Sequence, residues 1–266
     1  MKKPVYYVLI GVLLLVFCFS AFQIANYFIK GREKANQFDE LSQMVSQATT
    51  AATEPSTEAT TEATTEATTE PTEPTMIPGY ADVYALNGDM VGWLKIEGTK
   101  IDYPVMQTPD EPNYYLKRDF NRNYSDWGCL YAREECDVNT PSDTVTIYGH
   151  TMKDGSMFAA LHNYTDKSFY EDHKLIYFDT LTEYHVYEIF SVFKTSANLG
   201  EGFRYHVMEN AKDEKEFNDY VAECKKLSFY DTGITPVYGD KLILLSTCEY
   251  TLGDNSRLVV AARRVF

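Results

Sequence analysis

The stretch LILLSTCEYTLGDNSRLVV, residues 242–260, places a thiol and a guanidinium at facing ends of two apolar runs. The first run ends at Cys248, a polar turn follows, and Arg257 opens the second run. Two apolar runs joined in this way predict a β-hairpin, in which the end of one strand lies beside the start of the next. A neighbouring cation favours the thiolate form of a cysteine, and it also suits an oxyanion that forms next to the sulfur.

A nucleophilic cysteine also needs a partner that transfers protons, and His150 is the histidine whose context fits that role. It follows the apolar run DTVTIYG, residues 143–149, and precedes a glycine-containing loop. A histidine and a cysteine at the same end of two strands can converge although they are far apart in sequence. The other histidines have mixed polar surroundings and are interpreted as surface or hydrogen-bonding residues: His162, His173, His185 and His206.

The region from Met76 to Phe266 predicts a mostly β fold with inserted helices. Short β-branched or aromatic runs, separated by turn residues, indicate strands. These runs are TKIDYPVMQ (99–107), GCLYAR (128–133), DTVTIYG (143–149), KLIYFDT (174–180), YHVYEIFSVF (184–193), KLILLST (241–247) and RLVVAARRV (257–265). Helices are expected at about 80–91, after Gly155 and at 212–227. Many short strands with a few helices favour a closed or nearly closed β-barrel.

The remaining cysteines do not form a metal-binding pattern. The chain has five cysteines but no CxxC pair and no Cys/His ligand spacing, which speaks against a structural zinc site. Cys224 falls on the apolar stripe of the predicted helix 212–227, so we expect it in the core. Cys18 lies in an apolar run, where it acts as a small hydrophobic residue. Cys129 and Cys136 either pair as an extracellular disulfide or are independent small residues, and the sequence does not decide.

Residues 1–30 are interpreted as an N-terminal transmembrane anchor. The run from Pro4 to Ile29 carries no charge, and about 20 apolar residues suffice to cross a bilayer. A cleaved signal peptide is the alternative, but its apolar core would be shorter and would end at a small-residue cleavage site. Lysines flank the run on both sides, so the positive-inside rule gives no orientation. The segments that follow favour a cytoplasmic N-terminus and an extracellular body.

Residues 31–75 are predicted to be a juxtamembrane segment and a disordered stalk. A helical periodicity extends from Glu33 to Gln47, and a repeat of Thr, Glu and Ala follows. This repeat has no large apolar residue, and its like charges repel each other, so it should stay extended. The net charge of −15 excludes a typical nucleic-acid-binding protein, which needs a basic footprint.

Over residues 77–266 the chain resembles the sortases, membrane-anchored cysteine transpeptidases of Gram-positive bacteria, and class B in particular. The resemblance rests on LSTC (245–248) with an arginine opening the next strand, and on TIYGH (146–150) followed by DGSMFAAL (154–161). VGWLKIEGTKIDYPV (91–105) supports it, as does NYYL (113–116) ahead of GCLYAR. The resemblance implies a sortase-type eight-stranded β-barrel with N-terminal helices, a long helix between strands six and seven, and residues 76–266 as the catalytic domain.

The same resemblance implies roles for individual residues. Cys248 would be the nucleophile, His150 the general acid and base, and Arg257 the group that stabilises the oxyanion or positions the substrate. No metal or cofactor is needed for this chemistry. Three further residues are implied to bind substrate or to orient the arginine: Ser246, Glu249 and Phe203.

The implied reaction joins a surface protein to the cell wall. The thiolate attacks the threonine carbonyl of a C-terminal sorting signal, a thioester forms on Cys248, and an amine of a peptidoglycan precursor resolves it. The enzyme would then be a single-pass protein of the cell membrane. The sequence chooses neither the sorting motif nor the amine.

Three alternatives are weighed against this reading. A cysteine hydrolase would use water in place of the amine. An L,D-transpeptidase would resemble SHGC followed almost immediately by Arg, and STCEYTLGDNSR does not fit that pattern. An anchored, non-catalytic binding module would carry Cys248 as a structural thiol.

Overall fold

The computed structural model describes residues 3–53, 75–198, 200–249 and 255–266. The chain divides into two compact units, residues 1–40 and 41–266. Most of the predicted stalk lies outside the described residues. Helix α1, Lys3–Thr53, contains the predicted anchor and the helical periodicity that follows it. By length and composition, it is the one described helix suited to crossing a membrane.

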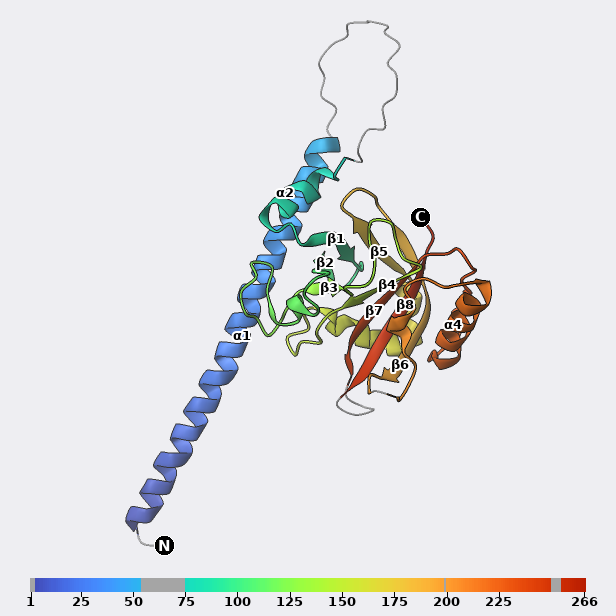
Figure 1. Ribbon diagram of the computed structural model, residues 1–266. Helices are drawn as coiled ribbons and strands as arrows, with labels where there is room; N and C mark the ends of the chain where they lie inside the picture. The colour runs from blue at the N-terminus through green and yellow to red at the C-terminus, as the bar shows by residue number, and fades with distance from the viewer. Residues whose placement is uncertain (1–2, 54–74, 199, 250–254) are drawn as a thin grey trace, which may run out of the picture. The chain divides into compact units, whose positions relative to one another are not determined.

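The second unit is built on a closed barrel of eight strands (Figure 1). Around the barrel the strands follow the order β1-β2-β3-β4-β7-β8-β6-β5. The prediction of a mostly β, eight-stranded barrel is therefore confirmed. The strands are β1 (Met90–Lys95), β2 (Asp102–Met106), β3 (Leu130–Ala132), β4 (Thr144–Tyr148), β5 (Leu175–Thr180), β6 (Val186–Ser196), β7 (Leu242–Glu249) and β8 (Ser256–Arg264).

Two pairings determine where the functional residues lie. Strands β4 and β7 are parallel, with Tyr148 opposite Ser246, so their carboxyl ends meet at the same rim of the barrel. Strands β7 and β8 form the antiparallel hairpin predicted from residues 242–260, with Cys248 opposite Arg257. Three neighbouring strands thus bring their ends to one place.

Short helices connect and cover the strands. The long helix α4 lies between β6 and β7, as the resemblance implied. The helix expected at about 80–91 ends earlier, because β1 already begins at Met90. The helix expected after Gly155 is a 3-10 helix. The helical elements that follow α1 are α2 (Pro78–Leu86), η1 (Tyr114–Lys117), η2 (Phe158–Thr165), α3 (Lys167–Asp172), η3 (Tyr205–Val207) and α4 (Glu214–Leu227).

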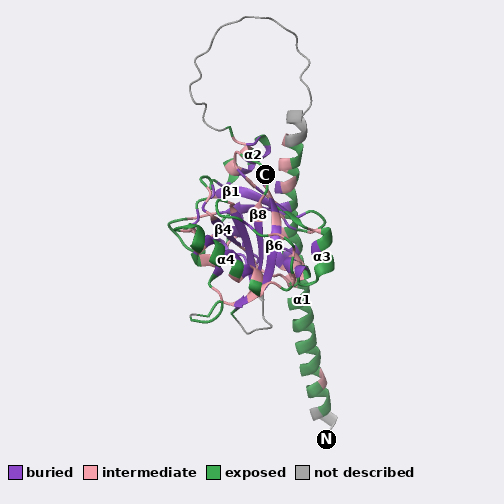
Figure 2. Cartoon of the chain, turned by 90° about the vertical axis from the view of Figure 1, so that its right-hand side faces the viewer, coloured by how far each residue is buried: buried purple, intermediate pink, exposed green. Residues whose placement is uncertain are grey.

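Helix α4 closes part of the hydrophobic core. Asp213 caps its N-terminus by accepting a hydrogen bond from the Glu216 amide at 2.8 Å. Its outer face is exposed, whereas the strands that it covers are buried (Figure 2). Cys224 lies in this core and is fully buried, which confirms the prediction from the apolar stripe. Cys129 and Cys136 are also buried, and no disulfide joins the two.

Candidate active site

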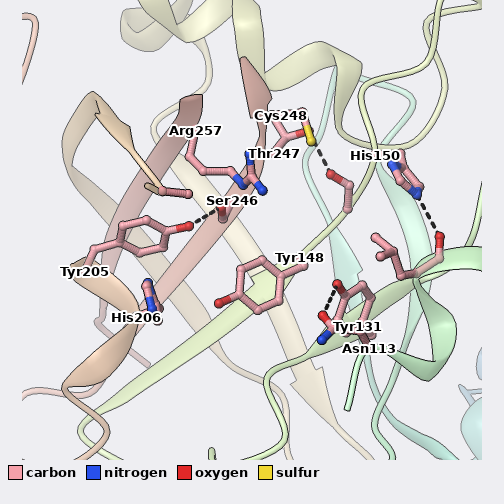
Figure 3. A pocket seen from close by; sticks show the side chains of 13 residues that line it. Asn113, Tyr131, Tyr148, His150, Tyr205, His206, Ser246, Thr247, Cys248 and Arg257 are labelled. Atoms are coloured by element: carbon pink, nitrogen blue, oxygen red, sulfur yellow. Dashed lines mark hydrogen bonds between the residues drawn. The ribbon is translucent and has the colours of Figure 1, made fainter. Parts of the chain in front are cut away.

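A groove of about 320 Å³ opens where β4 and β7 end and β8 begins (Figure 3). His150, Cys248 and Arg257 all line it, so the structure brings together the three residues to which the sequence assigned chemistry. The complete lining is Asn113, Leu116, Tyr131, Tyr148, Gly149, His150, Ala197, Tyr205, His206, Ser246, Thr247, Cys248 and Arg257.

The sheet fixes the relation between Cys248 and Arg257. The two are directly opposite each other in the antiparallel pair of β7 and β8, so their side chains project from the same face. Arg257 is held on its other side by β6, where it pairs with Thr195. Its Nη1 donates to the Ser256 carbonyl at 3.0 Å, and a guanidinium has further N–H donors in the same plane. Cys248 is a free, half-buried thiol, accessible from the groove.

His150 lies two residues beyond the end of β4, in the loop that leaves the sheet. Gly149 continues the parallel ladder, because its amide donates to the Ser246 carbonyl at 3.1 Å. A side chain at Gly149 would not fit, since a Cβ there would lie 2.5 Å from Leu130 Cδ2 and 2.7 Å from Phe158 Cδ2. The close packing around this glycine holds the backbone just before the histidine.

The imidazole of His150 is oriented by a main-chain carbonyl. Its Nε2 lies 2.7 Å from the Leu116 oxygen. A carbonyl only accepts hydrogen bonds, so Nε2 carries the proton, and in the neutral ring Nδ1 has the free lone pair. In Figure 3 the second ring nitrogen faces the side on which Cys248 and Arg257 lie. The contact therefore selects the tautomer that can accept a proton from the groove.

The surroundings of His150 favour its neutral form. Burial lowers the pKa of His150 below its usual value, and the charges of Lys117 and Arg257 act in the same direction. The Leu116 carbonyl and the Asp126 carboxylate oppose this effect without reversing it. At neutral pH the groove thus contains a neutral imidazole that can act as a base.

Aromatic side chains form the polar wall on the other side of the groove. The hydroxyls of Tyr205 and Ser246 are hydrogen-bonded at 2.6 Å, and Tyr220 donates to the Tyr205 carbonyl at 2.6 Å. Ser246 is buried, and its hydroxyl takes part in this wall. Tyr131 donates to Asn113 Oδ1 at 3.0 Å. The wall is therefore built from hydroxyl groups that already have partners.

The roles predicted for the other two substrate-binding residues, Glu249 and Phe203, stay predictions. Glu249 ends β7 opposite Ser256, and its side chain lies outside the described part of the chain. Phe203 packs against Phe193 and Tyr220, with ring centroids 6.0 and 5.3 Å away, and is not part of the groove lining. Its contact with a substrate stays a prediction.

Most of the residues that line the groove were not predicted from the sequence. NYYL, residues 113–116, and GCLYAR, residues 128–133, were singled out as motifs, but no role was assigned to any of their residues. Those motifs were the available signal for three of the lining residues. His206, interpreted from sequence as a surface or hydrogen-bonding residue, also lines the groove. The lining residues without a sequence-based assignment are Asn113, Leu116, Tyr131, Tyr148, Gly149, Ala197, Tyr205 and Thr247.

Comparison with known proteins identifies a matching protein family. The sequence profile described as "Sortase domain" matches residues 94–265. A protein named Sortase B from Listeria monocytogenes is 36% identical over 191 residues, which cover 69% of this chain and 73% of the relative. A protein named Sortase B from Staphylococcus aureus is 27% identical over 188 residues, covering 71% of this chain and 75% of the relative.

Comparison of the fold with solved structures also identifies sortase B proteins. The solved structure of a Staphylococcus aureus sortase B–substrate complex superimposes with a TM-score of 0.74 at 24% sequence identity. The match covers 89% of this chain and 98% of that one. The likeness therefore extends over nearly the whole of the solved chain.

Proposed function

Because this chain belongs to the sortase family, we propose that it is a class B cysteine transpeptidase with Cys248 as nucleophile, His150 as general acid and base, and Arg257 as oxyanion partner. The observation that carries the proposal is the cross-strand pairing of Cys248 with Arg257 on the groove that His150 also lines. A nucleophile, a base and a cation around one cavity are the groups that acyl transfer through a thioester requires.

In the first half-reaction, Nδ1 of His150 takes the proton of the Cys248 thiol. The sulfur attacks the carbonyl carbon of the threonine in a sorting signal, and a C–S bond forms. The negative charge that develops on the carbonyl oxygen is countered by the guanidinium of Arg257. The imidazolium then donates its proton to the departing nitrogen, the C–N bond breaks, and a thioester remains on the enzyme.

In the second half-reaction, an amine replaces the lost peptide. Its nitrogen attacks the thioester carbon and gives up a proton to the imidazole, which is neutral again after the first step. The C–S bond breaks, a new amide forms, and the imidazolium returns its proton to the sulfur. The lowered pKa of His150 suits both transfers, because the ring rests in its neutral form.

The partners follow from this chemistry. We propose surface proteins with a C-terminal sorting signal as acyl donors and a peptidoglycan precursor amine as acceptor. Residues 1–30 would anchor the chain in the membrane with the N-terminus in the cytoplasm, and residues 31–75 would hold the catalytic domain, 76–266, outside it. The apolar composition and length of α1 support the anchor.

A mass-resolved transfer assay tests the proposal. The full chain in detergent is incubated with a panel of sorting peptides, with and without triglycine as the amine. We expect a peptide–triglycine product cleaved after threonine, and loss of that product in Cys248→Ala. A product ending in a free carboxylate, even with the amine present, would identify a hydrolase instead.

Thiol labelling separates an enzyme from a binding module. A small thiosulfonate should modify Cys248 rapidly, because its sulfur is accessible from the groove. Cys129→Ala is the matched control, since the Cys129 side chain is buried and should contribute no label. An unreactive Cys248 together with no transfer product would contradict the catalytic assignment.

A further inference from the structure

A chain of side-chain hydrogen bonds connects the strand that carries Cys248 with the loop that carries His150. Thr247 Oγ1 donates to the Gly149 carbonyl at 2.7 Å. The hydroxyls of Thr151 and Thr247 are 2.8 Å apart, and Thr151 Oγ1 lies 2.9 Å from His162 Nε2. These contacts join the loop of residues 149–151 and the nearby His162 to Thr247, which lies 96 residues after Thr151.

The direction of every bond in this chain follows from the donor inventory. The Gly149 carbonyl only accepts, so the single hydroxyl proton of Thr247 is used there. Thr151 must therefore donate to Thr247, and the Cys248 carbonyl, 3.3 Å from Thr151 Oγ1, lies within reach of the same proton. With its own proton engaged, Thr151 accepts from His162, whose Nε2 carries a hydrogen in consequence.

The positions of these residues around the reactive groups are the main argument. Thr247 directly precedes Cys248, and Gly149 and Thr151 directly flank His150. Thr247, Cys248 and His150 lie at the same end of the groove (Figure 3). A change in any link therefore moves the backbone on one side of the sulfur or the imidazole.

We propose that Thr247 and Thr151 are positioning residues that set the distance between sulfur and imidazole, with His162 completing the chain. The proposal rests on the proposed function, because it concerns the spacing of Cys248 and His150. Sheet hydrogen bonds hold Cys248, whereas His150 lies beyond the end of β4, where the Phe158 amide donates to its carbonyl at 2.9 Å. We call Thr247, Thr151 and the Gly149 carbonyl the threonine clamp. The hydrogen bonds of this clamp restrain the backbone around His150, a residue that the sheet hydrogen bonds do not reach.

Paired substitutions separate the hydroxyl from the packing of each threonine. Valine keeps the shape of threonine and removes the hydroxyl, whereas serine keeps the hydroxyl and removes a methyl group. We expect Thr247→Val and Thr151→Val to lower kcat by about tenfold to a hundredfold with little change in KM, because small misplacements of reacting groups have costs of that order. Thr247→Ser and Thr151→Ser should keep kcat within about threefold of the wild type, since the hydrogen-bonded chain persists.

Thr232→Val is the matched control. Its hydroxyl also donates to a main-chain carbonyl, that of Phe190 at 2.9 Å, but it does not line the groove. This control should leave kcat unchanged, although it loses a bond of the same type. The variants are compared as full chains in detergent, with thermal unfolding measured beside the kinetics.

Two readouts make the result decisive. The first is kcat and KM in the transfer assay, after the wild type has been shown to depend on Cys248. The second is the rate of thiosulfonate labelling of Cys248 against pH, which needs no sorting peptide and follows the coupling of sulfur and imidazole. The valine variants should change the shape of this pH profile, and the serine variants and Thr232→Val should not.

The kinetic results of the valine and serine variants decide between the two possibilities. A loss of kcat in the valine variants, with kcat retained in the serine variants, supports the positioning role of the clamp. A loss of kcat in the serine variants with retention in the valine variants overturns it. Valine variants whose kcat and pH profile equal those of Thr232→Val also overturn it. If valine variants fail to fold, serine variants with impaired kcat and an altered pH profile also overturn it, and intact ones support it. A wild type without transfer activity refutes the proposed function instead, while the labelling profile still tests the clamp.

Discussion

Replacing Arg257 by glutamine removes the cation from the groove and leaves the strand pairing in place. Residues directly opposite in an antiparallel pair have Cβ atoms about 4.5–5.5 Å apart, so the guanidinium of Arg257 can reach a carbonyl bonded to the Cys248 sulfur. Loss of one oxyanion donor costs about 10²–10³ in kcat, or roughly 2.7–4 kcal/mol of transition-state stabilisation. We expect Arg257→Gln to lose kcat on that scale in the transfer assay.

The same substitution has a second, independent consequence for the pH profile. The charge of Arg257 lowers the pKa of His150, so its removal raises that pKa. Protonation of the imidazole abolishes its action as a base, and activity is therefore lost as pH falls through this pKa. The acid limb of kcat/KM should lie below pH ~6.5 in the wild type and move to higher pH in Arg257→Gln.

Arg257→Lys is the control that separates charge from geometry. Lysine keeps the positive charge but lacks the planar fork of donors. Its acid limb should stay near that of the wild type, while kcat falls. If Arg257→Gln keeps kcat within a few-fold of the wild type, the guanidinium does not stabilise the oxyanion. An acid limb that does not move would show that Arg257 and His150 are not electrostatically coupled.

Three substitutions test how the framework supports the groove. Gly149→Ala forces a Cβ to 2.5 Å from Leu130 Cδ2, and we expect a loss of about 1–3 kcal/mol of stability, measured by denaturant unfolding. Gly128→Ala places a Cβ 2.7 Å from the Leu116 oxygen at φ +62°, so it should displace the carbonyl that orients the imidazole and lower kcat more than KM changes. Cys224→Ser adds a hydroxyl to the core and should cost about 1–3 kcal/mol if the group finds no partner, with kcat of the folded enzyme unchanged.

The hairpin of residues 242–260 could be predicted from sequence because its determinants are local. Two apolar runs and a polar turn define both strands, and the register follows from the turn. The burial of Cys224 was equally local, since helical spacing places it on the apolar stripe. Features of this kind depend on residues that are close in sequence.

The parallel pairing of β4 with β7 could not be predicted in the same way. Residues 144–148 and 242–246 pair across a long intervening chain, and nothing in either run specifies the other. Family resemblance supplied that information, because it implied a complete barrel. Without it, the convergence of His150 and Cys248 was only a hypothesis about strand ends.

The Leu116 contact could not be predicted from residue type. Its carbonyl is a main-chain atom that every residue possesses, so a search for an acidic partner of His150 does not find it. The structure accounts for its position through Gly128, whose positive φ allows the backbone to approach residues 115 and 116 closely. The placement of Phe203 also depended on tertiary packing, since an aromatic residue suits a groove and a core equally well.

These observations explain why His150 needs more support than its two partners. Cys248 and Arg257 belong to neighbouring strands of a closed barrel, and the ladder fixes their separation. His150 has left the sheet, so the orientation of its ring depends on the Leu116 carbonyl, and its backbone is held by the Phe158 amide, which donates to its carbonyl at 2.9 Å, and by the threonine clamp. Because each of these supports consists of one or a few hydrogen bonds outside the sheet, losing one bond should misplace the imidazole without unfolding the barrel. The geometry of catalysis and the stability of the fold should therefore be separable by substitutions around the histidine, but not by substitutions within the strands.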